Sequence, residues 1–155
     1  MSKTYHGYYS SEIGTIKIVG EKNEILSIDF IENKPTTKTE IPSYLEDCIG
    51  QIDDYFRGEL KIFSVKLKLQ GTDFQTKVWK QLIKIPYGKT SSYKDIALKI
   101  GNPNAMRAVG SANRRNKLAI IVPCHRVIGS NGSLSGYAGG IWRKEWLLKH
   151  EKAKF

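Results

Sequence analysis

Hydrophobic and polar residues alternate along the first third of the chain, with the period of two that is typical of half-buried β-strands. The runs at residues 16–18 and 26–30 both follow this pattern, and the polar residues 21–24 between them predict a tight connection. A third run, at residues 65–69, alternates Val and Leu with Lys and predicts one more strand. The N-terminal half is therefore expected to contain a small antiparallel sheet.

A spacing of three and four residues marks the segment between the second and third of these runs and predicts a helix. Its apolar stripe consists of Leu45, Ile49, Ile52 and Phe56. Residues 43–46 fit a capping box at the start of this helix, and Gly58 fits a stop at its end. We expect residues 1–70 to form an α/β supporting domain.

The pattern changes at Gly71, after which short helical segments and sharp turns follow one another. Residues 72–75 fit a second capping box, and residues 86–88, Pro-Tyr-Gly, break the helix that it opens. Residues 91–114 predict two short helices joined by a Gly-Asn-Pro turn, in which the Asn-Pro pair caps the second helix. This matches a helix-turn-helix in length and turn chemistry, although a simple packing corner gives the same pattern.

A glycine-rich segment precedes the last predicted helix, which carries Trp142 and Trp146. Five glycines fall between residues 129 and 140. Because glycine lets the backbone approach a ligand closely, the segment suits a flat ligand held by backbone groups, with a flexible surface turn as the alternative. The predicted fold class is α/β, of the α+β kind: an N-terminal antiparallel sheet with a helix, then a mostly helical domain of residues 71–155 that contains the helix-turn-helix.

Basic residues are concentrated in the second half of the chain. Residues 1–70 hold nine Lys and Arg and eleven Asp and Glu, a net charge of −2. Residues 71–155 hold sixteen and four, a net charge of +12. This asymmetry favours a polyanion as the partner of the C-terminal domain, and a solvated basic surface is the alternative.

The composition excludes several classes of protein. An apolar content of 40% and a charged content of 26% are typical of a folded domain, and no apolar run reaches the ~20 residues of a membrane span. No membrane partner is therefore expected. The chain shows no signal peptide, and Cys48 and Cys124 are too few for a disulfide scaffold. We expect a cytoplasmic protein, or a nuclear one if the source is eukaryotic.

Small side chains predominate in the second helix of the predicted helix-turn-helix. They are Ala105, Ala108, Gly110, Ser111 and Ala112. Such residues allow close approach to sugar and phosphate but do not reach base edges. Of the long residues Met106 and Arg107, either suits a wedge inserted into the base stack from the minor groove, and a surface ion pair is the alternative for Arg107. Arg114 and Arg115 add positive charge at the end of the helix.

Cys124 is a candidate nucleophile, because His125 and Arg126 follow it directly. A lone cysteine is more often a buried apolar side chain. However, a neighbouring imidazole takes the proton of a thiol, and nearby cations stabilise the thiolate. Glu151 is the best candidate for the carboxylate that orients the histidine, with a solvated tail residue as the alternative. Adjacent Cys and His lack metal-ligand spacing, so no metal site is expected.

Nine short segments follow one another along the C-terminal half, and their order is characteristic. They are residues 71–75, 78–79, 85–88, 92–93, 107–110, 123–127 (Pro-Cys-His-Arg-Val), 136–140, 144–148 and 150–151. In this order they resemble the O6-alkylguanine-DNA alkyltransferases, also called methylated-DNA–protein-cysteine methyltransferases. The N-terminal half matches that family more loosely, by its strand pattern and by residues 55–58.

The resemblance implies catalytic roles for five residues. Cys124 attacks the alkyl carbon on guanine O6, and His125 acts as a base through a water molecule. Glu151 orients His125. Asn116 braces the active-site segment against the recognition helix, and Tyr93 donates a proton or a hydrogen bond to the departing guanine.

The resemblance also implies how DNA is bound. Arg107 fills the gap that the nucleotide leaves when it rotates out through the minor groove. Val127 and the backbone of residues 137–139 (Tyr137, Ala138 and Gly139) border the base pocket, and Ala138 stands where some members have Ser. The implied partner is double-stranded DNA containing O6-alkylguanine, with O4-alkylthymine as a candidate second substrate.

The implied reaction is one irreversible transfer by a monomer that uses no cofactor and no metal. Some members bind zinc in the N-terminal part, but this chain has no cysteine before Cys48. Two other functions stay open. One is a catalytically silent DNA-binding module of the same fold, and the other is a cysteine hydrolase that uses Cys124, His125 and Glu151.

Overall fold

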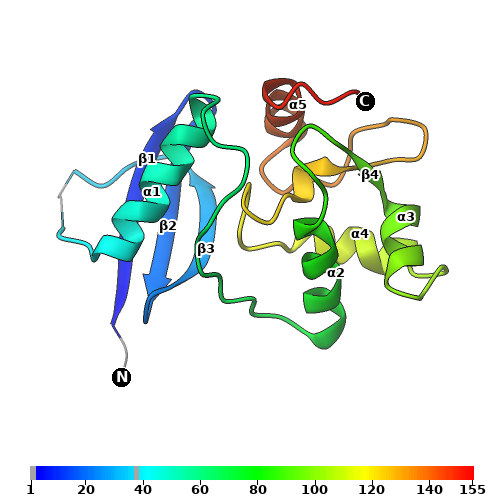
Figure 1. Cartoon of the computed structure of the whole chain (residues 1–155), viewed down its shortest axis with the longest axis horizontal. Helices are drawn as coiled ribbons and strands as arrows, with labels where there is room; N and C mark the ends of the chain where they lie inside the picture. Colours follow the sequence, from blue (N-terminus) through cyan, green and yellow to red (C-terminus); the bar gives the residue numbers. More distant parts are fainter. Residues whose placement is uncertain (1–2, 37–38) are drawn as a thin grey trace. The chain divides into compact units, whose positions relative to one another are not determined.

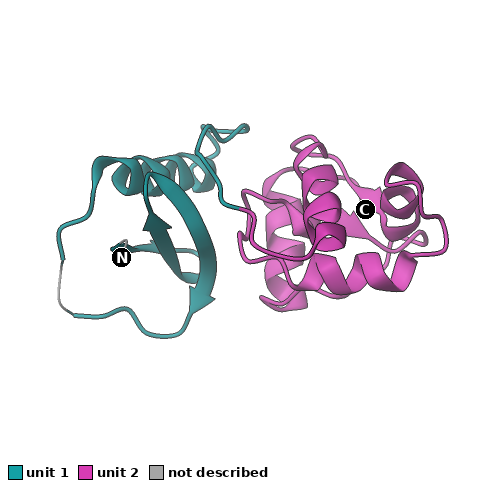
Figure 2. Cartoon of the chain, turned by 90° about the horizontal axis from the view of Figure 1, so that it is seen from below, with its two compact units in different colours: residues 1–68 teal, residues 69–155 magenta. Residues whose placement is uncertain are grey.

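The structure is a computed structural model that describes residues 3–36 and 39–155. The chain divides into two compact units between Lys68 and Leu69 (Figure 2). The first contains a three-stranded sheet and a helix, and the second is mainly helical (Figure 1). The predicted mixed α/β fold class is confirmed.

The first unit is an antiparallel sheet covered on one face by a helix. Its strands β1 (Thr4–Ser11), β2 (Gly14–Glu21) and β3 (Glu24–Ile31) are arranged in the order β1-β2-β3. The helix α1 (Ser43–Phe56) packs against β1 and β2 (Figure 1). Lys22 and Asn23 form the connection between β2 and β3, and both have positive φ angles (49° and 66°). A two-residue turn of this kind matches the twist of the strands that it joins.

The strand pattern departs from the prediction at β1 and at β3. The sequence did not indicate β1, because its only fully buried position is Gly7. In β3 the buried residues are Ile25 and Ile28, although the alternation predicted Leu26, Ile28 and Phe30 as one face. The pairing with β2 shifts between Val19 and Gly20 and leaves Leu26 unpaired. This β-bulge breaks the period of two.

The strand predicted at residues 65–69 is wrong. The segment makes a single parallel bridge, between Ile25 and Leu67. The Ile25 N–H donates to the Lys66 carbonyl at 2.8 Å, and the Lys68 N–H donates to the Ile25 carbonyl at 2.9 Å. Lys66 and Lys68 are exposed, as the alternation predicted. The bulge at Leu26 interrupts the edge of β3 beside this contact, so the ladder ends after one bridge.

The second unit surrounds a short 3₁₀ helix with longer helices. In chain order its elements are α2 (Asp73–Ile83), β4 (Ser91–Ser92), α3 (Tyr93–Lys99), α4 (Met106–Arg114), the 3₁₀ helix η1 (Cys124–Arg126), β5 (Val127–Ile128) and α5 (Ile141–His150). Helix α4 packs against α2 and α3, and both α2 and α5 contact η1. The short strands β4 and β5 pair in parallel. The packing therefore places η1 among helices that are distant in sequence.

The capping box predicted at residues 72–75 is confirmed, since Thr72 caps α2 together with Gln75. Ser92 caps α3 together with Asp95 in a second capping box, which was not predicted. The capping box predicted at residues 43–46 is wrong, since Pro42 is the N-cap of α1 and no side-chain hydrogen bond caps it.

The predicted Asn-Pro cap of α4 is also wrong, because α4 begins only at Met106. The Asn102 N–H donates to the Ala97 carbonyl at 3.0 Å, and Gly101 has a φ of 77°. Asn102 therefore belongs to the end of α3. Helix α3, the turn and α4 still form the predicted helix pair.

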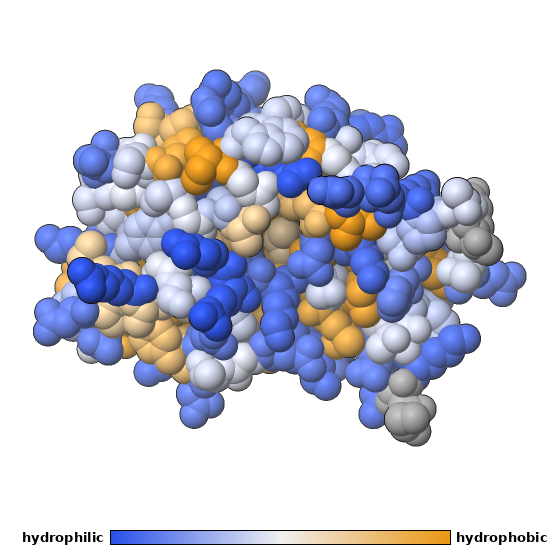
Figure 3. Space-filling view, turned by 180° about the vertical axis from the view of Figure 1, so that it is seen from behind, coloured by the Kyte–Doolittle hydropathy of each residue, from blue (hydrophilic) through white to orange (hydrophobic). Residues whose placement is uncertain are grey.

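The outer surface carries scattered apolar side chains. The exposed large ones among the described residues are Ile62, Ile83, Leu98, Met106, Ile141, Trp142 and Phe155. The face shown in Figure 3 is mainly hydrophilic, with apolar residues in small separate patches. None of the described helices combines the length and the hydropathy needed to cross a bilayer.

Thr72 and Ser43 were both predicted as helix caps, but only Thr72 caps a helix through its side chain. Alanine substitutions at the two positions should therefore differ in their effect on stability. Thr72→Ala should lower the free energy of unfolding by about 1 kcal/mol, because the Gln75 N–H loses its acceptor. Ser43→Ala should leave it nearly unchanged, because the Ser43 side chain does not cap α1. Urea-induced unfolding followed by circular dichroism measures both, and an equal loss would contradict the assignment.

Candidate active site

Cys124 is the first residue of η1 and is only 6% exposed. The Asn113 amide, from α4, donates to the Cys124 carbonyl at 3.3 Å. Burial raises the pKa of the Cys124 thiol above its usual value, while the Asn116 amide and the nearby Lys144 charge oppose this rise. The sulfur is thus a protonated thiol at neutral pH and needs a base before it can act as a nucleophile.

The segment before Cys124 is a tight loop held by Asn116. The Asn116 Nδ2 donates to the Val122 carbonyl at 2.8 Å, and its Oδ1 accepts from the Leu118 N–H at 2.9 Å. Inside this loop Ile120 has a φ of 72°, in the left-handed region that a β-branched residue rarely adopts. Such a conformation persists only where the surroundings enforce it. Asn116 therefore holds the loop before Cys124, and its bracing role against the recognition helix stays a prediction.

His125, Arg126 and Glu151 form one buried cluster. The His125 Nε2 and the Glu151 Oε2 lie 2.7 Å apart. Arg126 grips the same carboxylate with two bonds, from Nε to Oε1 at 2.8 Å and from Nη2 to Oε2 at 3.0 Å. All three residues are buried. Glu151, the C-cap of α5, is therefore part of the core of the second unit, and the alternative of a solvated tail residue is wrong.

Protonation states follow from these contacts. Burial raises the pKa of Glu151, but the hydrogen bonds and charges of His125 and Arg126 outweigh it and hold that pKa well below its usual range. Burial lowers the pKa of His125, and the bond to Glu151 opposes this only in part. At neutral pH the carboxylate is ionised and the imidazole is neutral. Its Nε2 carries the hydrogen that Glu151 accepts, which leaves the Nδ1 of His125 as an acceptor.

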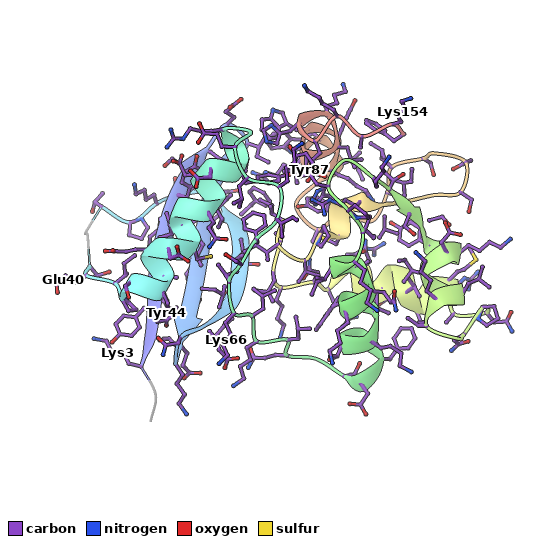
Figure 4. The ribbon with its side chains drawn as sticks, in the orientation of Figure 1. Lys3, Glu40, Tyr44, Lys66, Tyr87 and Lys154 are labelled. Carbon is purple, nitrogen blue, oxygen red and sulfur yellow. The ribbon has the colours of Figure 1, made fainter. Side chains whose placement is uncertain are left out.

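The loop after α2 closes over the carboxylate. The Gly88 N–H donates to the Glu151 Oε1 at 3.4 Å, and the Arg126 Nη1 donates to the Ile85 carbonyl at 2.8 Å. The ring of Tyr87, which is labelled in Figure 4, lies 5.7 Å from the Arg126 guanidinium. The break that the sequence predicted at residues 86–88 is therefore a wall of the candidate site.

A surface pocket of about 430 Å³ lies against the exposed side of α4. Its lining residues are Tyr93, Met106, Arg107, Gly110, Ser111, Arg114, Ser135 and Gly136. Six of the predicted site residues are among them, whereas Ala105, Ala108 and Arg115 are not. Small side chains on α4 make room for the pocket, and Arg107 and Arg114 give it a positive rim.

Two donors meet on one carbonyl at the edge of this pocket. The Tyr93 hydroxyl donates to the Ser135 oxygen at 3.0 Å, and the Lys144 Nζ donates to the same oxygen at 2.8 Å. Burial lowers the pKa of Lys144 to about 8 and raises that of Tyr93. The hydroxyl of Tyr93 is thus a proton donor, and the Lys144 ammonium lies 5.8 Å from its ring.

The residues predicted to border the base pocket lie in different surroundings. Tyr137 and Val127 are buried, Gly139 is half-buried and Ala138 is exposed. Burial raises the pKa of Tyr137 well above its usual value. The Gly139 carbonyl accepts a bond from the Arg143 Nη1 at 2.9 Å, which ties this loop to α5.

Three residues of the site were not predicted as site residues from the sequence: Asn113, Arg126 and Lys144. A signal for two of them exists, because polar residues interrupt stripes of helical spacing. Lys144 precedes Leu147, Leu148 and Glu151 on the buried face of α5. Asn113 likewise follows Val109 and Ala112 on the buried face of α4. A polar residue within an apolar stripe is expected to be buried and therefore to have a hydrogen-bond partner.

Other chemistry finds little support in the described residues. Residues 3–36 and 39–155 contain no group of three or more His, Cys, Asp or Glu side chains that could hold a metal ion. Cys48 is buried on α1, and burial raises the pKa of its thiol to about 12. It is therefore an inert side chain of the core.

Comparison with known sequence families agrees with this geometry. Residues 73–153 match the family described as "6-O-methylguanine DNA methyltransferase, DNA binding domain". Residues 4–69 match "6-O-methylguanine DNA methyltransferase, ribonuclease-like domain". The chain belongs to the 6-O-methylguanine DNA methyltransferase family. The family predicted from the order of the motifs is thus confirmed.

Curated relatives cover nearly the whole chain. A methylated-DNA–protein-cysteine methyltransferase of Methanosarcina acetivorans is 48% identical over 152 residues, which are 95% of this chain and 97% of the relative. The protein of that name from Mycobacterium bovis is 48% identical over 148 residues, 93% of this chain and 90% of its own. The crystal structure of Mycobacterium tuberculosis OGT in complex with DNA is 48% identical, with a TM-score of 0.87, and the match covers 95% of this chain and 92% of that one.

Two arginines test what the buried cluster contributes to stability. Arg126→Met should lower the free energy of unfolding by about 3–5 kcal/mol, because it leaves the Glu151 carboxylate buried without its bidentate partner. The matched control Arg57→Met removes an exposed partner of Asp53 and should change stability very little. Thermal and urea unfolding measure both variants, and similar losses would refute the assignment.

Proposed function

We propose that this chain repairs DNA by moving an alkyl group from O6 of a guanine to the Sγ of Cys124, in a direct and irreversible transfer. The observation that carries the proposal is the buried series of Cys124, His125 and Glu151 in the unit that also carries the basic pocket of α4. The product thioether is stable to water, so each molecule acts once. The relatives named above as methylated-DNA–protein-cysteine methyltransferases support this activity.

The cluster supplies the base that the thiol needs. His125 is neutral, and its Nδ1 is free of any bond to described residues. It takes the Cys124 proton through a water molecule, and the ionised Glu151 stabilises the imidazolium that forms. Removing the proton as the bond to carbon forms avoids a buried thiolate, which the surroundings disfavour. Asn116 acts here as a positioning residue, because it holds the loop that presents Cys124.

The departing guanine needs a proton donor. As the S–C bond forms, the C–O6 bond breaks and leaves its electron pair on the purine, which becomes an anion. Tyr93 lines the pocket of α4, and its hydroxyl is protonated at neutral pH. It donates a hydrogen bond or its proton to the purine, and the charge of the buried Lys144 beside it favours the same anion.

The substrate is double-stranded DNA that contains O6-alkylguanine, with O4-alkylthymine as a candidate second substrate. The O6 substituent is buried in stacked duplex, so the nucleotide must rotate out at a cost of a few kcal/mol. Arg107 fills the gap that it leaves, and Arg114 and Arg115 bind phosphates. The small residues Ala105, Ala108, Gly110 and Ser111 allow close approach, while Val127 and residues 137–139 border the base.

The two parts of the chain have different tasks in this proposal. Residues 71–155 bind DNA and transfer the alkyl group, and residues 1–70 support them. The protein acts as a monomer in the cytoplasm, or in the nucleus if the source is eukaryotic. It uses no cofactor, since the acceptor is its own cysteine.

Mass analysis of methyl transfer tests the proposal directly. After incubation with a duplex that contains O6-methylguanine, the peptide with Cys124 should gain one methyl group per molecule, and the peptide with Cys48 should gain none. Cys124→Ser should bind the same duplex and gain nothing. An unmodified Cys124 peptide would refute the proposal, and turnover of an ester or amide beyond one equivalent would favour a cysteine hydrolase.

Arg107 can be tested by comparing two substrates. Arg107→Ala should slow methyl transfer from duplex DNA roughly tenfold or more, because the flipped state loses the residue that fills the gap. Transfer from the free O6-methylguanine base should not change, since no gap forms. Arg57→Ala is the matched control, because Arg57 is an exposed arginine of the first unit that has no part in the proposed DNA binding. Equal losses of methyl-transfer rate on both substrates would show that Arg107 does not fill the gap in the duplex.

A further inference from the structure

Three buried side-chain atoms of the second unit make no hydrogen bond to any described residue: the Asn113 Oδ1, the His125 Nδ1 and the Tyr137 hydroxyl. Asn113 is 1% exposed and His125 is 0% exposed, so bulk solvent does not satisfy them. Buried polar atoms are nearly always paired, and an exception in a native fold points to a catalytic role or a bound molecule. The proposed mechanism uses the histidine but gives no task to Asn113.

The side-chain amide of Asn113 bonds to the backbone of the segment that carries the reacting residues. Its Nδ2 donates to the Cys124 carbonyl at 3.3 Å. The Oδ1 is bonded to the same carbon as the Nδ2, so it too lies beside the peptide that joins Cys124 to His125. Val109 and Ala112, also buried on α4, hold Asn113 on this inner face of the helix.

The Asn113 Oδ1 and the His125 Nδ1 can both only accept hydrogen bonds. The Nδ1 of His125 has no hydrogen, because the Nε2 carries the one that Glu151 accepts. The Oδ1 of an amide has none either. The thiol of Cys124 has one hydrogen and could satisfy only one of them. A water molecule has two, and its oxygen can accept the thiol hydrogen, which gives it three partners in a polar site.

We propose that Asn113 is a positioning residue whose Oδ1 orients the water that carries the Cys124 proton to His125. This inference rests on the proposed function. As the Sγ bonds to the alkyl carbon and the C–O6 bond breaks, the thiol proton passes to the water oxygen. One water hydrogen then passes to the Nδ1 of His125, while the other stays on the water oxygen and remains hydrogen-bonded to the Oδ1 of Asn113. The water emerges unchanged, and the imidazolium is paired with Glu151.

A pH profile can isolate this role, because Asn113 itself carries no charge. The titratable and charged groups that face the Cys124 site are Tyr93 from α3, Arg114 from α4, His125 and Arg126 from η1, Tyr137 from the glycine-rich loop, Lys144 from α5 and Glu151 at its end. An apolar replacement of Asn113 leaves every one of them in place. A changed profile therefore reports on the path of the proton.

The experiment measures two reactions of Cys124 across a range of pH. One is alkylation by iodoacetamide without DNA, and the other is methyl transfer from an O6-methylguanine duplex, both followed by the mass of the Cys124 peptide. Asn113→Leu and Asn113→Met remove the acceptor, and methionine adapts to irregular spaces if leucine does not fit. Asn113→Ser retains an acceptor. Val109→Ala is the matched control, because it weakens the packing of the same helix without removing a polar group.

The apolar variants should react roughly five- to tenfold more slowly at neutral pH in both reactions, the loss expected for one hydrogen bond. The midpoint of their profiles should move to higher pH, because the thiol loses its proton less readily. Asn113→Ser should lie near the wild type, and Val109→Ala should keep the wild-type midpoint.

Two results would overturn the inference. Unchanged midpoints in the apolar variants would make Asn113 a purely structural residue. Normal reaction with iodoacetamide together with impaired transfer from DNA would show that the Oδ1 serves the bound base. Failure of the proposed function is separate from both, because in that case the wild-type protein takes no methyl group from DNA, whatever its iodoacetamide profile.

Discussion

The ionised carboxylate of Glu151, buried and surrounded by donors, is the interaction on which the chemistry of the second unit depends. It accepts hydrogen bonds from His125, from Arg126 (two bonds) and from the Gly88 N–H. An unpaired carboxylate at this depth would take up a proton or destabilise the fold. By accepting these bonds, the carboxylate fixes the tautomer of His125. It also fastens η1 to the end of α5 and to the loop after α2, so the catalytic geometry and the local packing have the same origin.

In the proposed function, helix α4 links DNA binding to Cys124, because its two faces make different contacts. Its exposed side lines the pocket with Arg107 and Arg114. Its buried side reaches Cys124 through the amide of Asn113, and its carbonyl at Ala112 accepts the Trp79 Nε1–H at 2.8 Å, from α2. If DNA binding shifts this helix, the position of Cys124 changes directly, because no other element lies between the Asn113 amide and the Cys124 carbonyl. Short polar side chains on a buried helix face are well suited to such a link, since they leave little rotamer freedom to absorb the shift.

The sequence predicted what depends on neighbouring residues and missed what depends on distant ones. The cap at Thr72 needs only a partner three positions later, so the local pattern revealed it. The bulge at Leu26 depends on how β2 pairs, and no local pattern announces it. The motif order indicated Cys124, His125 and Glu151. Asn113, by contrast, bonds to a carbonyl eleven residues away in the sequence, and only the folded chain brings the two together.

The single bridge between Ile25 and Leu67 also bears on how the molecule behaves among copies of itself. Strand β3 ends the sheet on one side, and an open edge of this kind invites a strand of another molecule to pair with it. Here the segment that carries Lys66 and Lys68 lies against that edge, and both ammonium groups point into solvent. An irregular, charged cover with one bridge is a poor template for further pairing. The feature that replaces the predicted strand therefore protects this edge of the sheet from pairing with another molecule.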